Sequence, residues 1–164
     1  MFRKMRRKKQ ELTEKQCLDI LRRAKTATLA LSGNDGYPYS VPMNFVYEDG
    51  KIYFHGAKEG HKIDAIKNNP KVSMSIIDQE DVIEEELTTY FRSVILFGKA
   101  RILQEDDEIY HAIETLGLKY NEDEVAVEKE IQREWKALCC IEITIEYLTG
   151  KQAIELVNKN YQDF

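Results

Sequence analysis

Segment 53–62 reads Tyr-Phe-His-Gly-Ala-Lys-Glu-Gly-His-Lys and combines backbone and side-chain groups that could bind an anion. The pattern predicts a strand that ends at His55 and a helix that begins near Gly60. The first turn of a helix has unpaired N–H groups and a partial positive charge, so a lysine there is unfavourable unless an anion is bound nearby. A solvent-exposed lysine after an ordinary glycine turn is the alternative interpretation. The residues that could contribute to the anion site are Gly56, Ala57, His61 and Lys62.

Two other segments could contribute to a binding site. In segment 39–45, Pro42 removes a donor from the strand ladder, and Asn44 offers both a donor and an acceptor to a planar heterocycle. An ordinary bulged strand explains the same residues, and the spacing alone favours that interpretation. In segment 90–98, Ser93 shares a strand face with two large apolar residues. It could line a site or mark the exposed start of a strand.

The elements that must position these residues form a mainly β pattern with flanking helices. Alternating apolar residues predict strands, and 3.6-residue periodicity predicts helices. The tight turns at 33–36 and 48–50 predict that the first three strands form an antiparallel meander. About six antiparallel strands with few helices suggest a small closed or partly open barrel, filled by side chains, so that a ligand would sit outside it. The expected strands cover residues 26–32, 37–47, 51–57, 71–77, 88–103 and 138–147.

Helices are expected to begin at Thr13, with Gln16 completing a capping box, at Gly60, and at Asp106 as a cap. A weakly helical segment follows at residues 122–136. Three segments should lie outside regular structure. They are the basic arm at residues 1–10, the acidic segment 78–86 as a loop or another solvated element, and a short tail from residue 150.

Composition restricts the possible functions. The 164 residues suggest one domain spanning 1–164, and the net charge of −5 argues against binding to nucleic acid. No run of ~20 apolar residues could span a membrane. The three cysteines are an odd number, which fits reduced thiols in the cytoplasm. No zinc-ligand spacing, nucleophile elbow, Walker loop or dinucleotide motif occurs, so no metal site is expected and common hydrolases and nucleotide-triphosphate enzymes are disfavoured.

Several short motifs together resemble the pyridoxamine-phosphate-oxidase-like flavoproteins, closest to the nitroimidazole-reductase (Nim) branch. Each motif alone is weak, but their order and spacing make a specific match over nearly the whole chain. The motifs lie at residues 5–13, 36–45, 50–57, 60–66, 69–72, 93–98 and 148–151.

This resemblance implies a split β-barrel homodimer that binds FMN at the subunit interface. It places the flavin phosphate after the His-Gly-Ala strand end, with Lys62 as the main ligand. It places His55 near the flavin, where a side chain that titrates near neutral pH could donate a proton to a substrate. A structural strand histidine is the alternative for His55. The residues implied to contact the cofactor are Val41, Pro42, Met43, Asn44, His55, Gly56, Ala57, His61, Lys62, Ser93 and Val94.

The resemblance also implies an FMN-dependent oxidoreductase with a link to nitroimidazole resistance. Electrons would pass from reduced nicotinamide or another donor to a small acceptor, such as a nitro-aromatic or a quinone. The short segment after Leu148 lacks the arginine- and tryptophan-bearing end of true pyridoxamine-phosphate oxidases, which argues against that reaction. One alternative is a non-catalytic protein that binds flavin, a deazaflavin or haem, with His55 or His61 as the axial ligand. Another is an interaction protein that has lost the cofactor.

Overall fold

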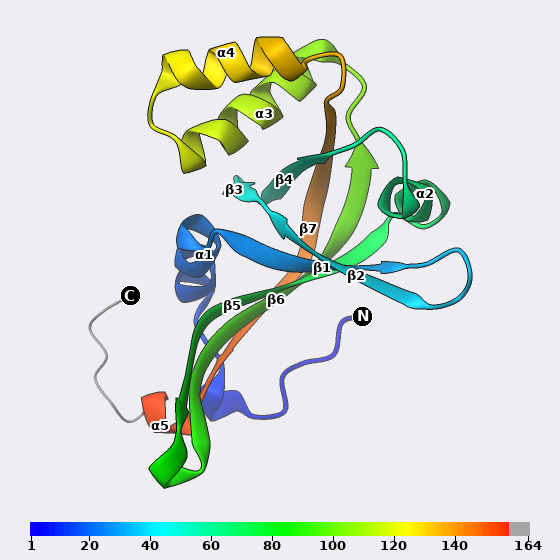
Figure 1. The fold of residues 1–164 in the computed structure, drawn as a ribbon. Coiled ribbons are helices and arrows are strands. Elements are labelled where there is room, and N and C mark those ends of the chain that lie inside the picture. The colour runs from blue at the N-terminus through cyan, green and yellow to red at the C-terminus, as the bar shows by residue number, and fades with distance from the viewer. Residues whose placement is uncertain (158–164) are drawn as a thin grey trace.

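The computed structural model describes residues 1–157, and its centre is a twisted, seven-stranded antiparallel sheet (Figure 1). The strand order is β2-β1-β5-β6-β7-β4-β3, so β2 and β3 are edges and the barrel is open. This confirms a mainly β fold with flanking helices, with seven strands in place of about six. The strands are β1 (Thr26–Ser32), β2 (Pro38–Asn44), β3 (Val46–Glu48), β4 (Lys51–Gly56), β5 (Lys71–Ile83), β6 (Thr88–Ile102) and β7 (Cys139–Gln152). The α-helices are α1 (Glu14–Arg23), α2 (His61–Asn68), α3 (Asp106–Tyr120), α4 (Glu124–Glu134) and α5 (Ile154–Val157).

The expected meander is wrong, because residues 37–47 form two strands with different partners. β2 pairs with β1, whereas β3 pairs with β4 at the opposite edge of the sheet. The chain crosses between them at Phe45, whose side chain is fully buried. The Tyr120 hydroxyl accepts a hydrogen bond from the Phe45 N–H at 3.1 Å, and the Lys119 ammonium donates to the Phe45 carbonyl at 2.9 Å. Burial of the Phe45 side chain and these long-range hydrogen bonds stabilise the crossing from one edge of the sheet to the other.

Two expected irregular segments are regular. The acidic segment 78–86 is not a loop, because β5 continues to Ile83 and a 3-10 helix follows at Glu84–Glu86. The β5–β6 hairpin therefore projects beyond the rest of the sheet (Figure 1). Residues after Gly150 are not a tail, because β7 continues to Gln152 beside the long β6. Gly150 allows close packing there, since a Cβ would lie 2.5 Å from the Cys17 Sγ.

Helix starts were predicted more accurately. The Thr13–Gln16 capping box is present at the start of α1. Asp106, however, is the first residue of α3 and not its cap, which is Glu105 without a side-chain hydrogen bond. The weakly helical segment contains α4, capped by Asp123.

Part of the amino-terminal arm packs on the sheet, contrary to the expectation of a solvated segment. Residues Lys8–Gln10 form a 3-10 helix, and the buried Gln10 side chain donates to the Gln152 carbonyl at 2.9 Å. The Phe2 ring stacks on Tyr147 with centroids 5.0 Å apart. All three cysteines are buried and unpaired. Within residues 1–157, no helix is both long enough and apolar enough to cross a lipid bilayer.

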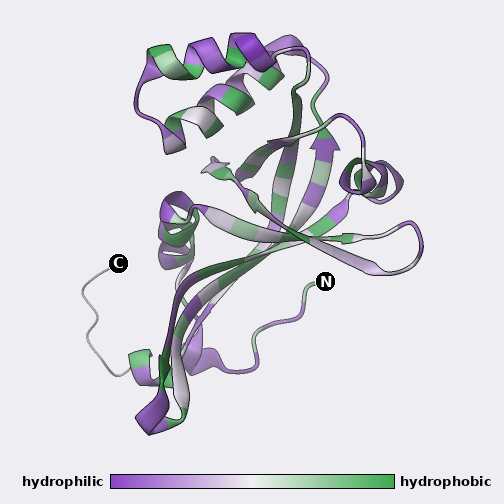
Figure 2. Cartoon of the chain, in the orientation of Figure 1, coloured by the Kyte–Doolittle hydropathy of each residue, from purple (hydrophilic) through white to green (hydrophobic). Residues whose placement is uncertain are grey.

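Two apolar cores lie on opposite faces of β4 and β7, as the alternating hydropathy of these strands shows (Figure 2). Phe54 belongs to the core that α1 and α2 cover, whereas Tyr53 belongs to the core beneath α3 and α4. Because strand residues alternate in direction, His55 points toward the α3–α4 side and Gly56 lies on the α2 side. The last two residues of β4, His55 and Gly56, can therefore contribute to two different surfaces.

Candidate functional site

The strand end at Gly56 makes room for a half-buried ammonium group. A Cβ at position 56 would lie 2.9 Å from the Lys62 Nζ, so glycine lets this amine rest against the backbone. The Nζ also lies 5.5 Å from the centre of the Phe54 ring. Burial lowers the pKa of Lys62, and no carboxylate within residues 1–157 lies at ion-pair distance from it. A partly desolvated cation without a protein anion is a suitable partner for an anionic ligand.

The first turn of α2 adds hydrogen-bond donors next to this lysine. Gly60 precedes the helix with a φ of 121°, a conformation that favours glycine, and it has no side chain to cap the helix. The first N–H groups of α2 are therefore free of a side-chain cap. Lys62 lies in the same turn, so backbone donors and a positive charge occur together.

His61 connects this helix to the β1–β2 hairpin. Its imidazole stacks on the Tyr39 ring with centroids 4.3 Å apart and planes 11° apart. A Cβ at Gly33 would lie 3.2 Å from its Nε2. This stack brings segments 39–45 and 53–62 side by side, although the His61 ring is itself in contact with protein.

β2 is an edge strand, a position that tolerates prolines because the missing N–H can face solvent. The side chains of Val41 and Met43 pack against the core, whereas Pro42 and Asn44 are exposed on the opposite face. Among the described residues, the outer edge of β2 has no strand partner. A planar ligand could therefore use the backbone groups of this edge, since a proline is tolerated on the strand side that faces solvent.

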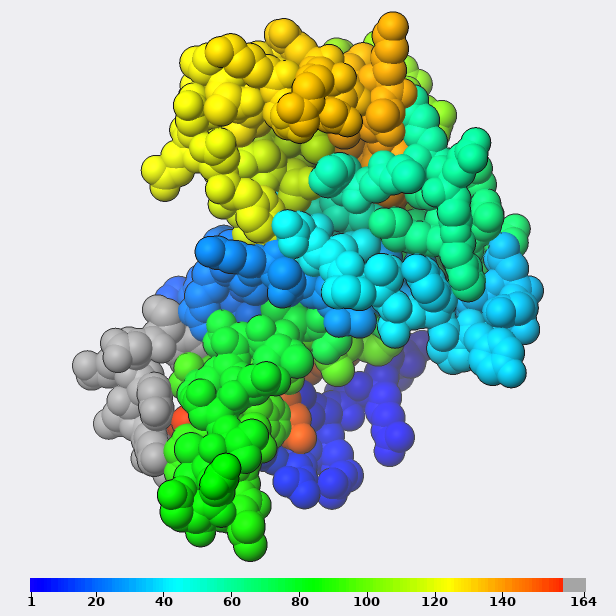
Figure 3. Space-filling model, viewed as in Figure 1, coloured from blue at the N-terminus to red at the C-terminus, as the bar shows by residue number. Residues whose placement is uncertain are grey.

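His55 and Asn44 line one cavity of about 530 Å³ beneath the α3–α4 hairpin. In the space-filling view, this hairpin overhangs the segment that ends β4 (Figure 3). Burial lowers the pKa of His55, and the positive charge of Lys62 lowers it further. A neighbouring cavity of about 510 Å³ shares His55 and includes Gly56 and Ala57. The structure thus brings together four of the predicted positions around the end of β4.

α3 and α4 contribute walls to this cavity that the local sequence pattern does not predict. A Cβ at Gly117 would lie 2.7 Å from the Val127 Cγ1, so a glycine within a helical pattern marked the close approach of these two helices. Two carboxylates, Glu130 and Glu134, lie at the cavity on α4. Its apolar lining residues are Ile113, Leu116, Ala126, Val127, Ile131 and Leu138.

Ser93 and Val94 lie apart from these residues within one chain. The Val94 side chain is fully buried in the core, which leaves only its backbone for a ligand. Ser93 faces the other side of β6, opposite Ile77 on β5 and Lys151 on β7. Neither residue lines the cavities that contain His55.

Comparison with known proteins identifies the family. A profile of the family described as Pyridoxamine 5'-phosphate oxidase matches residues 13–152. The chain belongs to this family. The match covers all seven strands, so the open sheet is the split barrel that the sequence motifs implied.

Several solved structures share the fold at low sequence identity. A candidate 5-nitroimidazole antibiotic resistance protein from Bacteroides thetaiotaomicron is 23% identical with a TM-score of 0.71, covering 86% of this chain and 85% of that one. A FAD-binding protein from Mesorhizobium loti is 22% identical with a TM-score of 0.63, covering 87% of this chain and 96% of that one. A FAD- and haem-binding protein from Mycobacterium smegmatis is 20% identical with a TM-score of 0.72, covering 88% and 73%.

A curated sequence relative is an uncharacterized protein, RA0666, from Rhizobium meliloti. It is 26% identical over 100 residues, which is 61% of this chain and 61% of that protein. The chain therefore matches less than two thirds of the length of that relative.

Proposed function

We propose that this protein is a flavin-dependent oxidoreductase that binds FMN and reduces a small acceptor such as a nitro-aromatic or a quinone. The observation that carries the proposal is the half-buried Lys62 ammonium, which lies against Gly56 and has no ion-pair partner among residues 1–157. A dianionic phosphate would neutralise this charge and accept hydrogen bonds from the uncapped first turn of α2. Relatives that are described as FAD-binding support a flavin in this fold.

The other predicted residues fit the rest of such a cofactor. The open edge of β2 at Val41–Asn44 presents backbone donors and acceptors to the polar edge of a flavin ring. A bound flavin would supply the hydride and electron transfer, and the protein would position the reactants. His55 would face the acceptor in the cavity beneath α3 and α4. Because its pKa is lowered, its imidazole is mainly neutral at pH 7 and can orient an acceptor through a ring N–H.

We also propose that two copies assemble and complete the site. Ser93 lies on the exposed face of β6 together with Ile95, which is 42% exposed, and Phe97, which is 37% exposed. Ile77, at 60% exposure, extends this apolar face onto β5. A second copy packed on this face would cover these side chains and could bring the Ser93 region to a cofactor bound by its partner. The three free cysteines suit the reducing cytoplasm, where we place the protein.

A second candidate function is cofactor binding without catalysis. Among residues 1–157, the His55 ring has no hydrogen-bond partner, so it is free to act as an axial ligand of haem. Solved relatives described as haem proteins are compatible with this role. The absorption spectrum of the purified protein separates the two functions, because flavin and haem have different bands. A flavin spectrum combined with turnover of a nitro-aromatic supports the oxidoreductase.

The phosphate assignment is tested by Lys62→Ala, with Lys129→Ala as a matched control on the exposed surface of α4. We expect Lys62→Ala to weaken FMN binding at least tenfold, since a charge-assisted hydrogen bond contributes about 1.5–3 kcal/mol. Quenching of flavin fluorescence during titration measures the Kd. Equal FMN affinity of the two variants and the unmodified protein would remove Lys62 from the site.

A further inference from the structure

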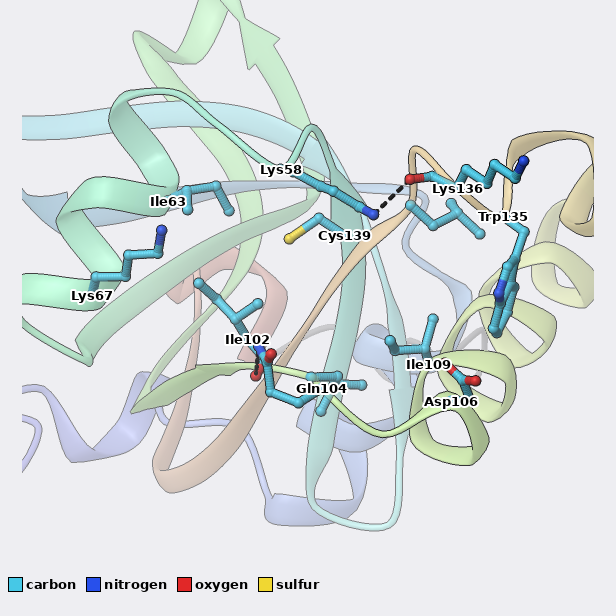
Figure 4. Close-up of a pocket in the computed structure, with 12 residues that line it drawn as sticks. Lys58, Ile63, Lys67, Ile102, Gln104, Asp106, Ile109, Trp135, Lys136 and Cys139 are labelled. Carbon is cyan, nitrogen blue, oxygen red and sulfur yellow. Dashed lines mark hydrogen bonds between the residues drawn. The ribbon is translucent and has the colours of Figure 1, made fainter.

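A third cavity, of about 660 Å³, lies between α2, the end of β6 and the start of α3 (Figure 4). None of the residues proposed above to bind FMN lines it. Its size is in the range of small-molecule sites. The proposed flavin chemistry therefore leaves this cavity without a role.

One end of this cavity is cationic. The Lys58 Nζ donates to the Lys136 carbonyl at 2.5 Å, which holds the ammonium over the cavity, and Lys67 extends toward it from α2 (Figure 4). Neither Lys58 nor Lys67 forms an ion pair within residues 1–157. The Cys139 thiol lies between them. Burial raises its pKa, and the positive charges of Lys62, Lys58 and Lys67 partly oppose that rise.

The other end of the cavity has a different chemistry. The half-buried Trp135 forms an aromatic wall beside the first turn of α3 (Figure 4). Next to it is the Asp106 carboxylate, which has no ion-pair partner among the described residues. The Gln104 side chain also lines the cavity and lies beside Ile102 (Figure 4). The Gln104 amide nitrogen lies 3.4 Å from the Ile102 carbonyl, so its carbonyl oxygen remains available as an acceptor. This end offers a stacking surface and a carboxylate acceptor, and the Lys136 side chain lies next to Trp135 (Figure 4).

We propose that this cavity binds a nucleoside diphosphate group, either free or as half of a dinucleotide. Its phosphates would pair with Lys58 and Lys67, and its base would stack on Trp135. The Asp106 carboxylate would accept hydrogen bonds from the ribose hydroxyls or from an exocyclic amine. A simple aromatic acid would satisfy the lysines but would place no donor near Asp106. A ligand with an anion at one end and hydrogen-bond donors on a ring system at the other satisfies both ends.

The test uses ADP as the probe. Trp135 is the single tryptophan of the chain, so its fluorescence reports directly on the cavity. We expect ADP to change this fluorescence and to release or absorb heat in calorimetry. Lys67→Glu should weaken ADP binding by at least about tenfold. Lys129→Glu, which makes the same charge change on α4 away from the cavity, should leave the affinity unchanged.

Lys67→Ala removes the charge without reversing it and should also weaken ADP binding. Circular dichroism verifies that each variant is folded. Absence of both a heat signal and a fluorescence change with millimolar ADP would overturn the proposal. Equal affinities of Lys67→Ala, Lys67→Glu and the unmodified protein would also overturn it.

Comparison of FMN, FAD and NADPH identifies the source of the nucleotide. Tighter binding of FAD than of FMN, reduced by Lys67→Ala, indicates that the cavity holds the nucleotide half of a flavin dinucleotide. Trp135 quenching by NADPH without a preference for FAD indicates an electron donor. Lys62→Ala should weaken FMN binding more than ADP binding, whereas Lys67→Ala should weaken ADP binding more than FMN binding. Failure of the flavin proposal is therefore distinguishable from failure of this one.

Discussion

At Gly56, the Lys62 ammonium lies where the side chain of any other residue would begin. A Cβ there would meet the Nζ at 2.9 Å, and the Nζ is the free end of a flexible side chain. An added methyl group would therefore displace the amine and leave the backbone unchanged. Glycine at this position therefore leaves room for the Lys62 ammonium, in addition to any preference for glycine in a tight turn. His55, one residue earlier, is affected by the same charge.

Gly56→Ala should accordingly reduce FMN affinity without reducing stability. We expect a Kd increase of about three- to tenfold, because the displaced ammonium loses its position against the phosphate. The thermal midpoint should stay the same or rise slightly, since alanine restricts the unfolded chain more than glycine does. Flavin fluorescence titration and calorimetric melting measure the two quantities. A large fall in the melting midpoint would show that Gly56 has a structural role instead.

The pKa of His55 provides a second test at this scale. Burial is the main cause of its lowered pKa, and the Lys62 charge is the second. Both disfavour the imidazolium, so His55 should titrate below the usual value of a free histidine. In Lys62→Ala the pKa should rise but stay below that value, because burial remains. NMR titration of the His55 ring protons measures this shift, and an unchanged pKa in the variant would show that the two groups are not coupled.

At the scale of the elements, features formed by residues close in sequence were predictable. Features formed by residues far apart in sequence were not. The capping box at Thr13 and the junction at 53–62 involve neighbouring residues, so spacing alone predicted them. The crossing at Phe45 depends on Lys119 and Tyr120, more than 70 residues later, and no local pattern encodes it. The walls of the His55 cavity come from α3 and α4 for the same reason. The junction between the end of β4 and the start of α2 was therefore predictable, whereas the cavity beside it was not.

Tyr120→Phe tests the crossing. The hydroxyl accepts from the Phe45 N–H and lies within hydrogen-bond distance of the carbonyls of Lys25 and Phe45. Its loss should lower the free energy of unfolding by about 1 kcal/mol, as expected for a partly buried hydrogen bond. Tyr110→Phe is the matched control, since its hydroxyl bonds to Glu128 on the exposed surface. Urea denaturation should show a smaller effect for the control, and equal effects would contradict the role assigned to Tyr120.

For the whole molecule, the open barrel separates the predicted cofactor residues into two groups. The edge of β2, the end of β4 and the start of α2 lie together around His61 and Tyr39. Ser93 lies on the outer face of β6, beside exposed isoleucine and phenylalanine side chains. One chain does not bring these groups to one ligand, because Ser93 lines neither cavity that contains His55. A second copy would both cover the apolar face and join the two groups.

Ile95→Glu should therefore change assembly and cofactor binding together. A charge at this position would remain unpaired on an apolar interface, so we expect dimers to dissociate and FMN affinity to fall with them. Val125→Glu introduces the same charge at an exposed apolar residue of α4 and should change neither property. Sedimentation velocity measures the mass, and flavin fluorescence measures binding on the same samples. A dimer that survives Ile95→Glu would place the interface elsewhere, and a monomer that retains full FMN affinity would show that one chain forms the complete site.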